Sequence, residues 1–337
     1  MDMNKVLGNM NEADLSTLQK AAEVLATNTF DPAVRSVFAP ENLDARVKLT
    51  VPTATPLRNR FARVSGYGQA AAWKRLTSKL HRLSGHAGLG TQTGVAFADA
   101  GTPNETAQTY TVTSAAYKLL GRKIDLGGMY IAASKHREGG IPDAFEHRLN
   151  IKMVETMIGE EEMIIGGNAT SNTLEFDGLA TQITTYSGTS SLLTVSGVNL
   201  YAGSIYDEGG SPTLLVANRR QTQGLADQLQ GTGSIQRIMI DNQGNGLGGL
   251  RLTKIVNSID GGVIDVVTSR YVGGLAFLLT ERDDSGENMI EMDDLIPMSR
   301  VDVPSTTFST TAFVVEATVL KVIAEPWQYK ISGLAVA

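Results

Sequence analysis

The feature that most constrains the fold is one long amphipathic segment, residues 141–165, which reads IPDAFEHRLNIKMVETMIGEEEMII. Pro142 suits the first turn of a helix, and Gly166 and Gly167 favour its end. A helix of this length spans about 36 Å at 1.5 Å per residue. Its apolar residues form two stripes, one of Phe145, Leu149, Met153 and Met157 and one of Ile151, Val154, Ile158 and Ile165. Two stripes predict a structural helix that is packed on two sides.

Three consecutive glutamates, Glu160, Glu161 and Glu162, lie near the end of this predicted helix. Successive helical residues are turned by about 100°, so the three carboxylates point in different directions and cannot converge on one ion. The nearest histidine, His147, lies more than three turns away along the axis. A metal or acid/base site is therefore disfavoured, and we expect the glutamates to face solvent or a neighbouring protein.

Charge is distributed unevenly along the 337 residues, although the net charge is only −6. Residues 45–98 contain no acidic side chain and nine basic ones: Arg46, Lys48, Arg58, Arg60, Arg63, Lys74, Arg75, Lys79 and Arg82. An acidic stretch lies far away and contains Glu281, Asp283, Asp284, Glu287, Glu291, Asp293 and Asp294. This separation is compatible with nucleic-acid contact, with a solvated face, or with complementary surfaces on neighbouring copies of the chain.

The first half of the chain is predicted to contain two segments without a core of their own. Residues 12–26 read as a short amphipathic helix, and residues 31–56 contain four prolines and read as an extended arm. Two strand-rich stretches then flank a glycine-rich connector, residues 81–106. A connector this long is unusual in a compact domain. We therefore expect a long basic hairpin that needs a partner, with a surface loop as the alternative.

The second half alternates helical and strand patterns. Residues 199–298 read as a compact mixed α/β unit. The final stretch, TAFVVEATVLKVIAEPWQYKISGLA, reads as two strands broken at Pro326. Two C-terminal strands are expected to return to an earlier sheet.

Motifs of known chemistry are weak in this sequence. GNGLGG, residues 244–249, matches a dinucleotide-binding pattern, but a strand pattern follows it and not a helix. The same region resembles a calcium loop, yet its twelfth position is Leu252, which offers no carboxylate. The chain has no cysteine and four histidines, His81, His86, His136 and His147, which form no ligand pattern. We therefore predict no enzyme activity, no cofactor and no metal.

The order of the parts resembles a known family. The pieces that carry the resemblance are YTVTSAAYKLLGRKIDL before the long helix, EEEMIIGGN at its end, FDGLATQI after it, SPTLLVANRRQTQGLADQL, and ATPLRNRFARVSGYGQAAAW. Together they resemble the major capsid proteins of tailed bacteriophages, which have the Hong Kong 97 type fold. The resemblance implies an α+β fold with an N-terminal arm, an extended β-hairpin loop (E-loop), a peripheral domain with a long spine helix, and an axial α/β domain.

The resemblance also implies boundaries for these parts. Residues 1–56 would form the arm with its short helix and residues 57–120 the extended loop. Residues 121–198 would form the peripheral domain with the spine helix at 141–165, and residues 199–295 the axial domain. Residues 296–337 would supply strands that return to the axial and peripheral domains.

The implied function is self-assembly into pentamers and hexamers of an icosahedral head that encloses double-stranded DNA, contacted weakly and without sequence specificity. Implied partners are copies of the chain, a portal protein, a scaffolding protein and a decoration protein, with no membrane. The implied location is the virion capsid, assembled in the host bacterial cytoplasm. Candidate intersubunit contacts are Arg58, Arg60, Arg63, Trp73, Lys74, Arg75, Lys79, Arg82, Glu160, Glu161, Glu162, Asp283, Asp284 and Glu287.

Two alternatives stay open at this point. An encapsulin-like nanocompartment shell shares the fold and would enclose a cargo enzyme. A soluble α/β enzyme with a nucleotide loop at residues 244–249 would instead be a monomer or small oligomer. Crosslinking of subunits through Lys74 or Lys79 is disfavoured, because no partner asparagine and glutamate can be identified.

Overall fold

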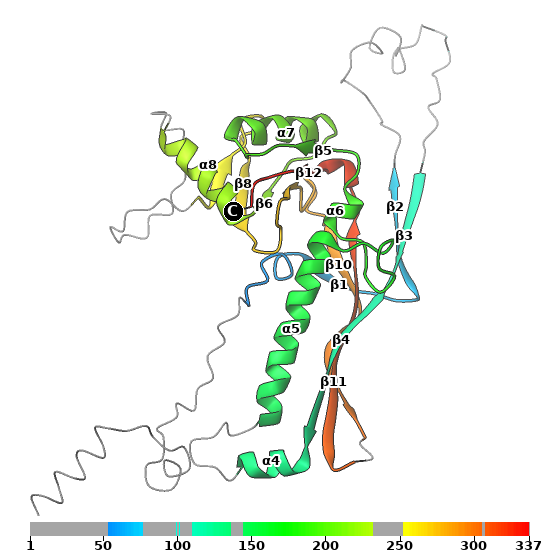
Figure 1. The fold of residues 1–337 in the computed structure, drawn as a ribbon. Helices are drawn as coiled ribbons and strands as arrows, with labels where there is room; N and C mark the ends of the chain where they lie inside the picture. The colour runs from blue at the N-terminus through cyan, green and yellow to red at the C-terminus, as the bar shows by residue number, and fades with distance from the viewer. Residues whose placement is uncertain are drawn as a thin grey trace, which may run out of the picture. The chain divides into compact units, whose positions relative to one another are not determined.

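The computed structural model describes residues 53–76, 99, 101, 110–135, 144–231, 252–304 and 307–336. Residues 50–133 and 143–337 form one compact unit, and the fold below is that of this unit (Figure 1). The second unit, residues 1–49 and 134–142, lies outside the described residues except for the end of one helix. The predicted helix at 12–26, nearly all of the connector at 81–106, Lys79, Arg82 and the glycine-rich stretch at 244–249 also lie outside them.

The predicted long helix is confirmed as α5, Ala144–Gly166. It packs beside strands β4 (Lys118–Gly127) and β11 (Ser309–Val322), as Figure 1 shows. Phe145 and Leu149 of its first stripe are buried against both strands. In the second stripe only Ile165 is buried, whereas Ile151, Val154 and Ile158 are half-buried. The prediction of packing on two sides thus holds within the chain only at the C-terminal end of α5.

A four-stranded sheet lies beside α5, with strand order β1-β10-β11-β4. Strand β1 (Ala62–Ser65) runs parallel to β10 (Ile290–Val303), and the other two pairs are antiparallel. Strand β10 was not predicted, because its sequence IEMDDLIPMSRVDV contains four acidic residues and Pro297. The pairing register shifts between Ile296 and Ser299, which is where a proline can be accommodated in a ladder.

The predicted α/β unit is a six-stranded sheet of order β5-β12-β9-β6-β8-β7. Its strands are β5 (Ser187–Thr189), β6 (Leu214–Ala217), β7 (Lys254–Val256), β8 (Val263–Thr268), β9 (Ala276–Leu279) and β12 (Gln328–Ser332). Every residue of β6 and β9 is buried, as expected for central strands covered on both faces. Helices α7 (Val195–Asp207) and α8 (Arg219–Gly231) pack beside it.

The two C-terminal strands are confirmed. Strand β11 ends at Val322, a short 3-10 helix spans Glu325–Trp327 around Pro326, and β12 follows. Strand β11 joins the four-stranded sheet, whereas β12 joins the six-stranded one. The two consecutive strands β11 and β12 therefore connect the four-stranded sheet to the six-stranded sheet.

Three further elements complete the unit. Strands β2 (Ala70–Leu76) and β3 (Tyr110–Ala116) form a separate two-stranded sheet. Helix α4 (Gly128–Lys135) follows β4, and helix α6 (Leu179–Gln182) follows the loop after α5. Among the described residues, no helix is both long enough and apolar enough to span a membrane.

Candidate assembly surface

Residues 53–65, which we call the root segment, are the first described residues and lead from the arm to the hairpin. Leu57 is fully buried and Phe61 is 5% exposed, and both belong to a core that includes Ile164 of α5 and Met292 of β10. A local turn, in which the Phe61 N–H donates to the Leu57 carbonyl, brings these two side chains inward together. The root segment is therefore part of the folded unit and not of a free arm.

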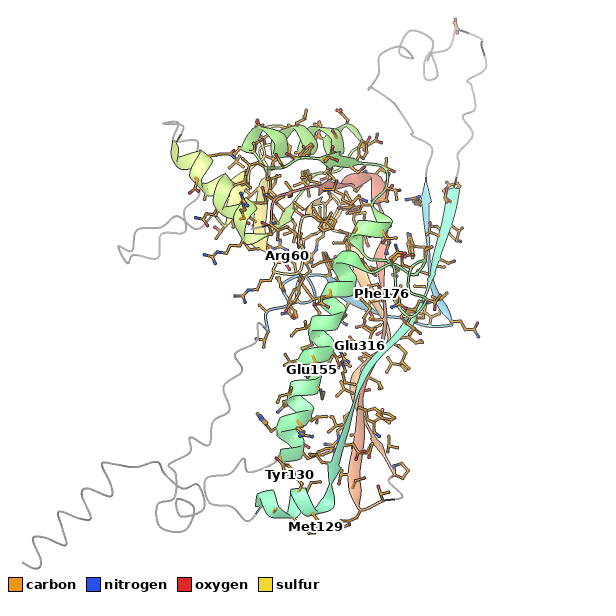
Figure 2. All side chains as sticks on the ribbon, in the orientation of Figure 1. Arg60, Met129, Tyr130, Glu155, Phe176 and Glu316 are labelled. Carbon is orange, nitrogen blue, oxygen red and sulfur yellow. The ribbon has the colours of Figure 1, made fainter. Side chains whose placement is uncertain are left out.

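Two arginines of the root segment lie among carboxylates from three elements, and Figure 2 labels Glu316 at this place. Arg58 donates through Nε to Glu160 of α5 and through Nη2 to Glu316 of β11, at 3.3 Å. Arg63 donates through Nη1 to Glu316, at 2.7 Å, and to Asp294 of β10, at 2.8 Å. Its Nη2 donates to Glu160. These ion pairs join α5, β10 and β11 through the root segment.

Glu161 holds the root segment by its backbone. Its carboxylate accepts the N–H groups of Leu57, at 3.1 Å, and Arg58, at 2.7 Å. Burial raises the pKa of Glu161, although these two hydrogen bonds oppose the shift. We call this group the clamp and define it as Arg58, Arg63, Glu160, Glu161, Asp294 and Glu316.

The burial of the clamp corrects one prediction. Glu160 and Glu161 have no exposed surface, so the expectation that they face solvent or a neighbouring copy is wrong. They point in different directions, as the helical geometry predicted, but both are directed at the root segment. Buried carboxylates are stabilised when they are paired and hydrogen-bonded, and the arginines and N–H groups of the root segment supply those partners. Glu162 is exposed.

Arg60 also pairs within the chain. Its guanidinium donates to both carboxylate oxygens of Glu281, at 2.6 and 2.7 Å, and to Asp265 of β8, at 2.7 Å. Hydrogen bonds from the guanidinium to Glu281 raise the pKa of Arg60 far above its ordinary value. Arg60 therefore connects the root segment to the six-stranded sheet. Part of the predicted complementarity between basic and acidic stretches is thus met inside one chain.

The hairpin of β2 and β3 presents two different faces. Residues 71, 73 and 75 of β2 lie opposite residues 115, 113 and 111 of β3 and form one face. Trp73 on this face is 9% exposed, and neither its Nε1 nor the Nε of Arg75 has a hydrogen-bond partner. Buried donors without a hydrogen-bond partner are rare in the interiors of native proteins.

The opposite face of the hairpin is open. Every described residue on this face is exposed: residues 70, 72 and 74 of β2 and residues 110, 112, 114 and 116 of β3. It carries Val112, 62% exposed, and Tyr110, 64% exposed, beside Lys74. Two-stranded sheets are marginally stable alone and need packing against another surface. Open apolar residues on such a ribbon mark a candidate contact with another protein.

The acidic candidates Asp283, Asp284 and Glu287 lie in a tight turn after β9. Asp283 accepts the hydroxyl of Ser285, at 2.6 Å, and the N–H of Glu287, at 2.7 Å. The serine hydrogen bond is the main cause of a lowered pKa for Asp283. Asp284 and Glu287 are exposed and hold their charges outward.

Within the described residues no group of three or more histidines, aspartates and glutamates could hold a metal ion. The candidates fall into two sets. Arg58, Arg60, Arg63, Glu160 and Glu161 lie in ion pairs and hydrogen bonds inside the chain, whereas Lys74, Glu162, Asp284 and Glu287 face outward.

Glu316 is the central residue that the sequence analysis missed. It stands alone within the apolar run TAFVVEATVL, and a single charge inside such a strand indicates a buried, paired group. Burial and the charge of Glu160 raise the pKa of Glu316, against the lowering effect of Arg63 and Arg58. Its Oε2 atom is buried without a hydrogen-bond partner.

Several solved capsid and encapsulin structures are similar to this fold. The chain is similar to a capsid protein of cyanophage A-1(L), with a TM-score of 0.62, 12% identity, and 87% of this chain and 96% of that chain covered. It is also similar to a capsid protein of a native GTA particle (TM-score 0.60, 10% identity, 91% and 100% covered). A third likeness is to the SrpI encapsulin of Synechococcus elongatus (TM-score 0.59, 10% identity, 92% and 97% covered). At such identities the likeness establishes the fold, which is that of shell-forming proteins.

The family follows from the sequence itself. Residues 22–335 match the family model described as SU10 major capsid protein, so the chain belongs to the SU10 major capsid protein family. The prediction of a tailed-bacteriophage major capsid protein with the Hong Kong 97 type fold is confirmed. A search of curated proteins returns no significant match. Family and fold indicate a structural protein of the virion capsid that associates with its own copies.

Proposed function

We propose that this chain forms pentamers and hexamers that close into an icosahedral head around double-stranded DNA. The observation that carries the proposal is the family match over residues 22–335. The open apolar face of the β2–β3 hairpin supports it, because that face is expected to be covered in the working form of the protein. We assign no enzymatic activity to the chain.

In this proposal the hairpin of one copy lies over the next copy. Identical chains that meet head to tail bring different surfaces together, so Val112 and Lys74 would meet a surface of another type. Exposed ion pairs contribute only about 0 to 1 kcal/mol each. Apolar burial repeated at every subunit would therefore supply most of the stability, and Lys74, Arg75, Glu162, Asp283, Asp284 and Glu287 would fix register.

We assign the parts of the subunit as follows. Helix α5 and the four-stranded sheet are the peripheral domain, and the six-stranded sheet with α7 and α8 is the axial domain. Residues 57–120 supply the extended loop, but Leu57 and Phe61 of the root segment belong to a core that is shared by α5, the four-stranded sheet and the six-stranded sheet. Residues 290–295 likewise belong to β10 and not to the axial sheet.

Assembly in the host bacterial cytoplasm with a portal protein, a scaffolding protein and a decoration protein is part of the same proposal. Contact with DNA would be weak, because a net charge of −6 gives little attraction for phosphate. A nanocompartment shell is the second candidate, favoured by the likeness to the SrpI encapsulin.

The test is electron microscopy of particles formed by the full-length chain, followed by mass spectrometry and nucleic-acid extraction. Closed shells that package DNA and carry a portal protein support the head. Closed shells filled with one cargo enzyme favour the nanocompartment. A monomer or small oligomer that binds nucleotide would overturn both and return to the enzyme alternative.

A further inference from the structure

We propose that the clamp is a proton-dependent fastener, which holds the root segment against α5, β10 and β11 more tightly when its buried carboxylates share a proton than when all are ionised. The root segment leads into strand β2, so a fastener here governs how the hairpin leaves the folded unit. The proposal depends only on contacts within one chain and is independent of the proposed function.

The first argument is the balance of charge. The clamp contains two guanidinium groups and four carboxyl groups, and Glu160, Glu161 and Glu316 have no exposed surface. Full ionisation would leave excess negative charge out of contact with water, which is costly. One proton removes part of that excess without removing an arginine contact, because Glu316 accepts Arg58 and Arg63 through Oε1 alone.

The second argument is a buried oxygen atom without a hydrogen-bond partner. Oε2 of Glu316 is buried and has no hydrogen-bond partner. An ionised carboxylate oxygen in that position lacks the donors that would stabilise its charge, whereas a protonated carboxyl has no net charge to stabilise. The geometry therefore favours a proton on Glu316, whose two arginine contacts are both made through the other oxygen, Oε1.

Several other charged side chains on the neighbouring strands pair with groups outside the clamp. On β10 and β11, Glu291 and Asp293 pair with Lys321, at 2.6 and 2.9 Å. On β4, Arg122 lies 3.9 Å from Glu155 and Lys118 donates to the Thr173 carbonyl. The charge of Asp293 acts on Tyr117, and the charges of Glu162 and Glu161 act on Tyr271. In the described part of the chain, Arg58 and Arg63 are thus the cations that face the Glu316 and Glu160 pair.

The direction of the pH effect follows from linkage. Burial raises the pKa values of Glu316 and Glu161 in the closed clamp, and exposure to water on opening would restore ordinary values of about 4.3. The closed form then binds more protons than the open form. Its added stability is fully present below the ordinary pKa and is lost as pH rises through the raised one.

Hydrogen exchange of the full-length chain tests this directly. The amides of Leu57 and Arg58 donate to Glu161, so their exchange reports opening of the clamp. We expect their opening constant, corrected for the intrinsic rate, to rise as pH increases above the ordinary carboxyl pKa of about 4.3, by up to about tenfold per pH unit for one proton. The amide of Val216 in β6 serves as internal reference for global unfolding.

Variants locate the proton. Glu316→Gln should reduce the pH dependence to the part that Glu161 contributes, and the matched control Glu162→Gln, exposed on the same helix as Glu160, should keep the wild-type slope. A flat wild-type profile overturns the proposal even if no variant folds. A full wild-type slope retained in Glu316→Gln overturns it as well.

Discussion

The root segment and the hairpin come from the same stretch of sequence without acidic residues, but their basic side chains have different partners in the folded chain. Arg58, Arg60 and Arg63 of the root segment each pair with carboxylates of the same chain. Lys74 of the hairpin is exposed, and the Nε of Arg75 has no partner. Separation of charge along a sequence therefore does not tell whether complementary charges meet within one chain or between two.

The cause of the difference is strand pairing. Strand β1 adds to the edge of β10, where Ser65 lies opposite Asp294 and Val64 opposite Asp293. This register carries Arg63 into an acidic neighbourhood that the sequence places more than two hundred residues away. The hairpin strands pair with each other only, so their charges find no such neighbourhood within the described residues.

Arg63→Met should have the largest effect on the free energy of unfolding, because Arg63 of the root segment is paired within the chain and the described basic residues of the hairpin are not. It removes one of the two cations shared by Glu160 and Glu316, both without exposed surface, and leaves Arg58 alone to balance their buried charge. We expect the free energy of unfolding to fall by about 3–5 kcal/mol. Urea denaturation of the purified chain measures it.

The matched control is Lys74→Met on the hairpin, which should leave the urea midpoint unchanged. Equal losses for the two substitutions would contradict the distinction between an internally paired root segment and an outward-facing hairpin. The measurement is best made near neutral pH, where the carboxylates of the clamp carry the most charge.

Val112→Asp tests the opposite region. Val112 is 62% exposed, so an aspartate there should leave the unfolding of the isolated subunit intact. In the assembled form it would lose apolar burial of about 1.5 to 3 kcal/mol. The concentration needed for assembly, followed by light scattering, should rise at least about tenfold.

Val112→Thr is the graded control, since it keeps shape and strand preference and should raise that concentration less. Trp73→Ala is a poorer probe, because Trp73 is 9% exposed and its loss would also disturb packing inside the chain. Assembly of Val112→Asp at the wild-type concentration would remove the hairpin face from the proposed interface.

Much of the fold could be predicted from periodicity, and much of the clamp could not. The two stripes and terminal glycines of α5 placed that helix within three residues of its observed start. Strand β10 escaped prediction because its acidic residues suggest a surface loop, although Lys321 and the root segment neutralise them. The partners of Glu160, Arg58 and Arg63, are both about a hundred residues away, a distance at which one sequence gives no pairing signal.

Glu325→Gln should have an intermediate effect and sharpens the comparison through pH. Burial alone would raise the pKa of Glu325, but hydrogen bonds from Thr185 and Thr184 outweigh it and lower that pKa. The carboxylate accepts both their N–H groups, at 2.6 and 2.7 Å. Its contribution to stability is therefore present above the ordinary pKa and is lost as pH falls, which is opposite in sign to the clamp.

We expect Glu325→Gln to reduce the free energy of unfolding by about 1–3 kcal/mol near neutral pH and by less in acid. Thermal unfolding across pH measures the difference between variant and wild type. Glu316→Gln is the comparison variant, and its difference from wild type should change with pH in the other direction. The same sign for both would show that burial alone does not account for the Glu316 shift.

Lys74→Gln should have the smallest effect on assembly, and the salt dependence of that effect is the informative measurement. Lys74 is exposed beside Val112, so any ion pair that it forms in an assembly lies near solvent. Such pairs contribute about 0 to 1 kcal/mol and are screened over roughly 10 Å at 0.1 M salt. The variant should therefore assemble less readily than wild type at low salt and equally well at high salt. A difference that persists at high salt would mean that Lys74 is desolvated in the assembly, and the hairpin would then hold a buried charge of its own, as the root segment does.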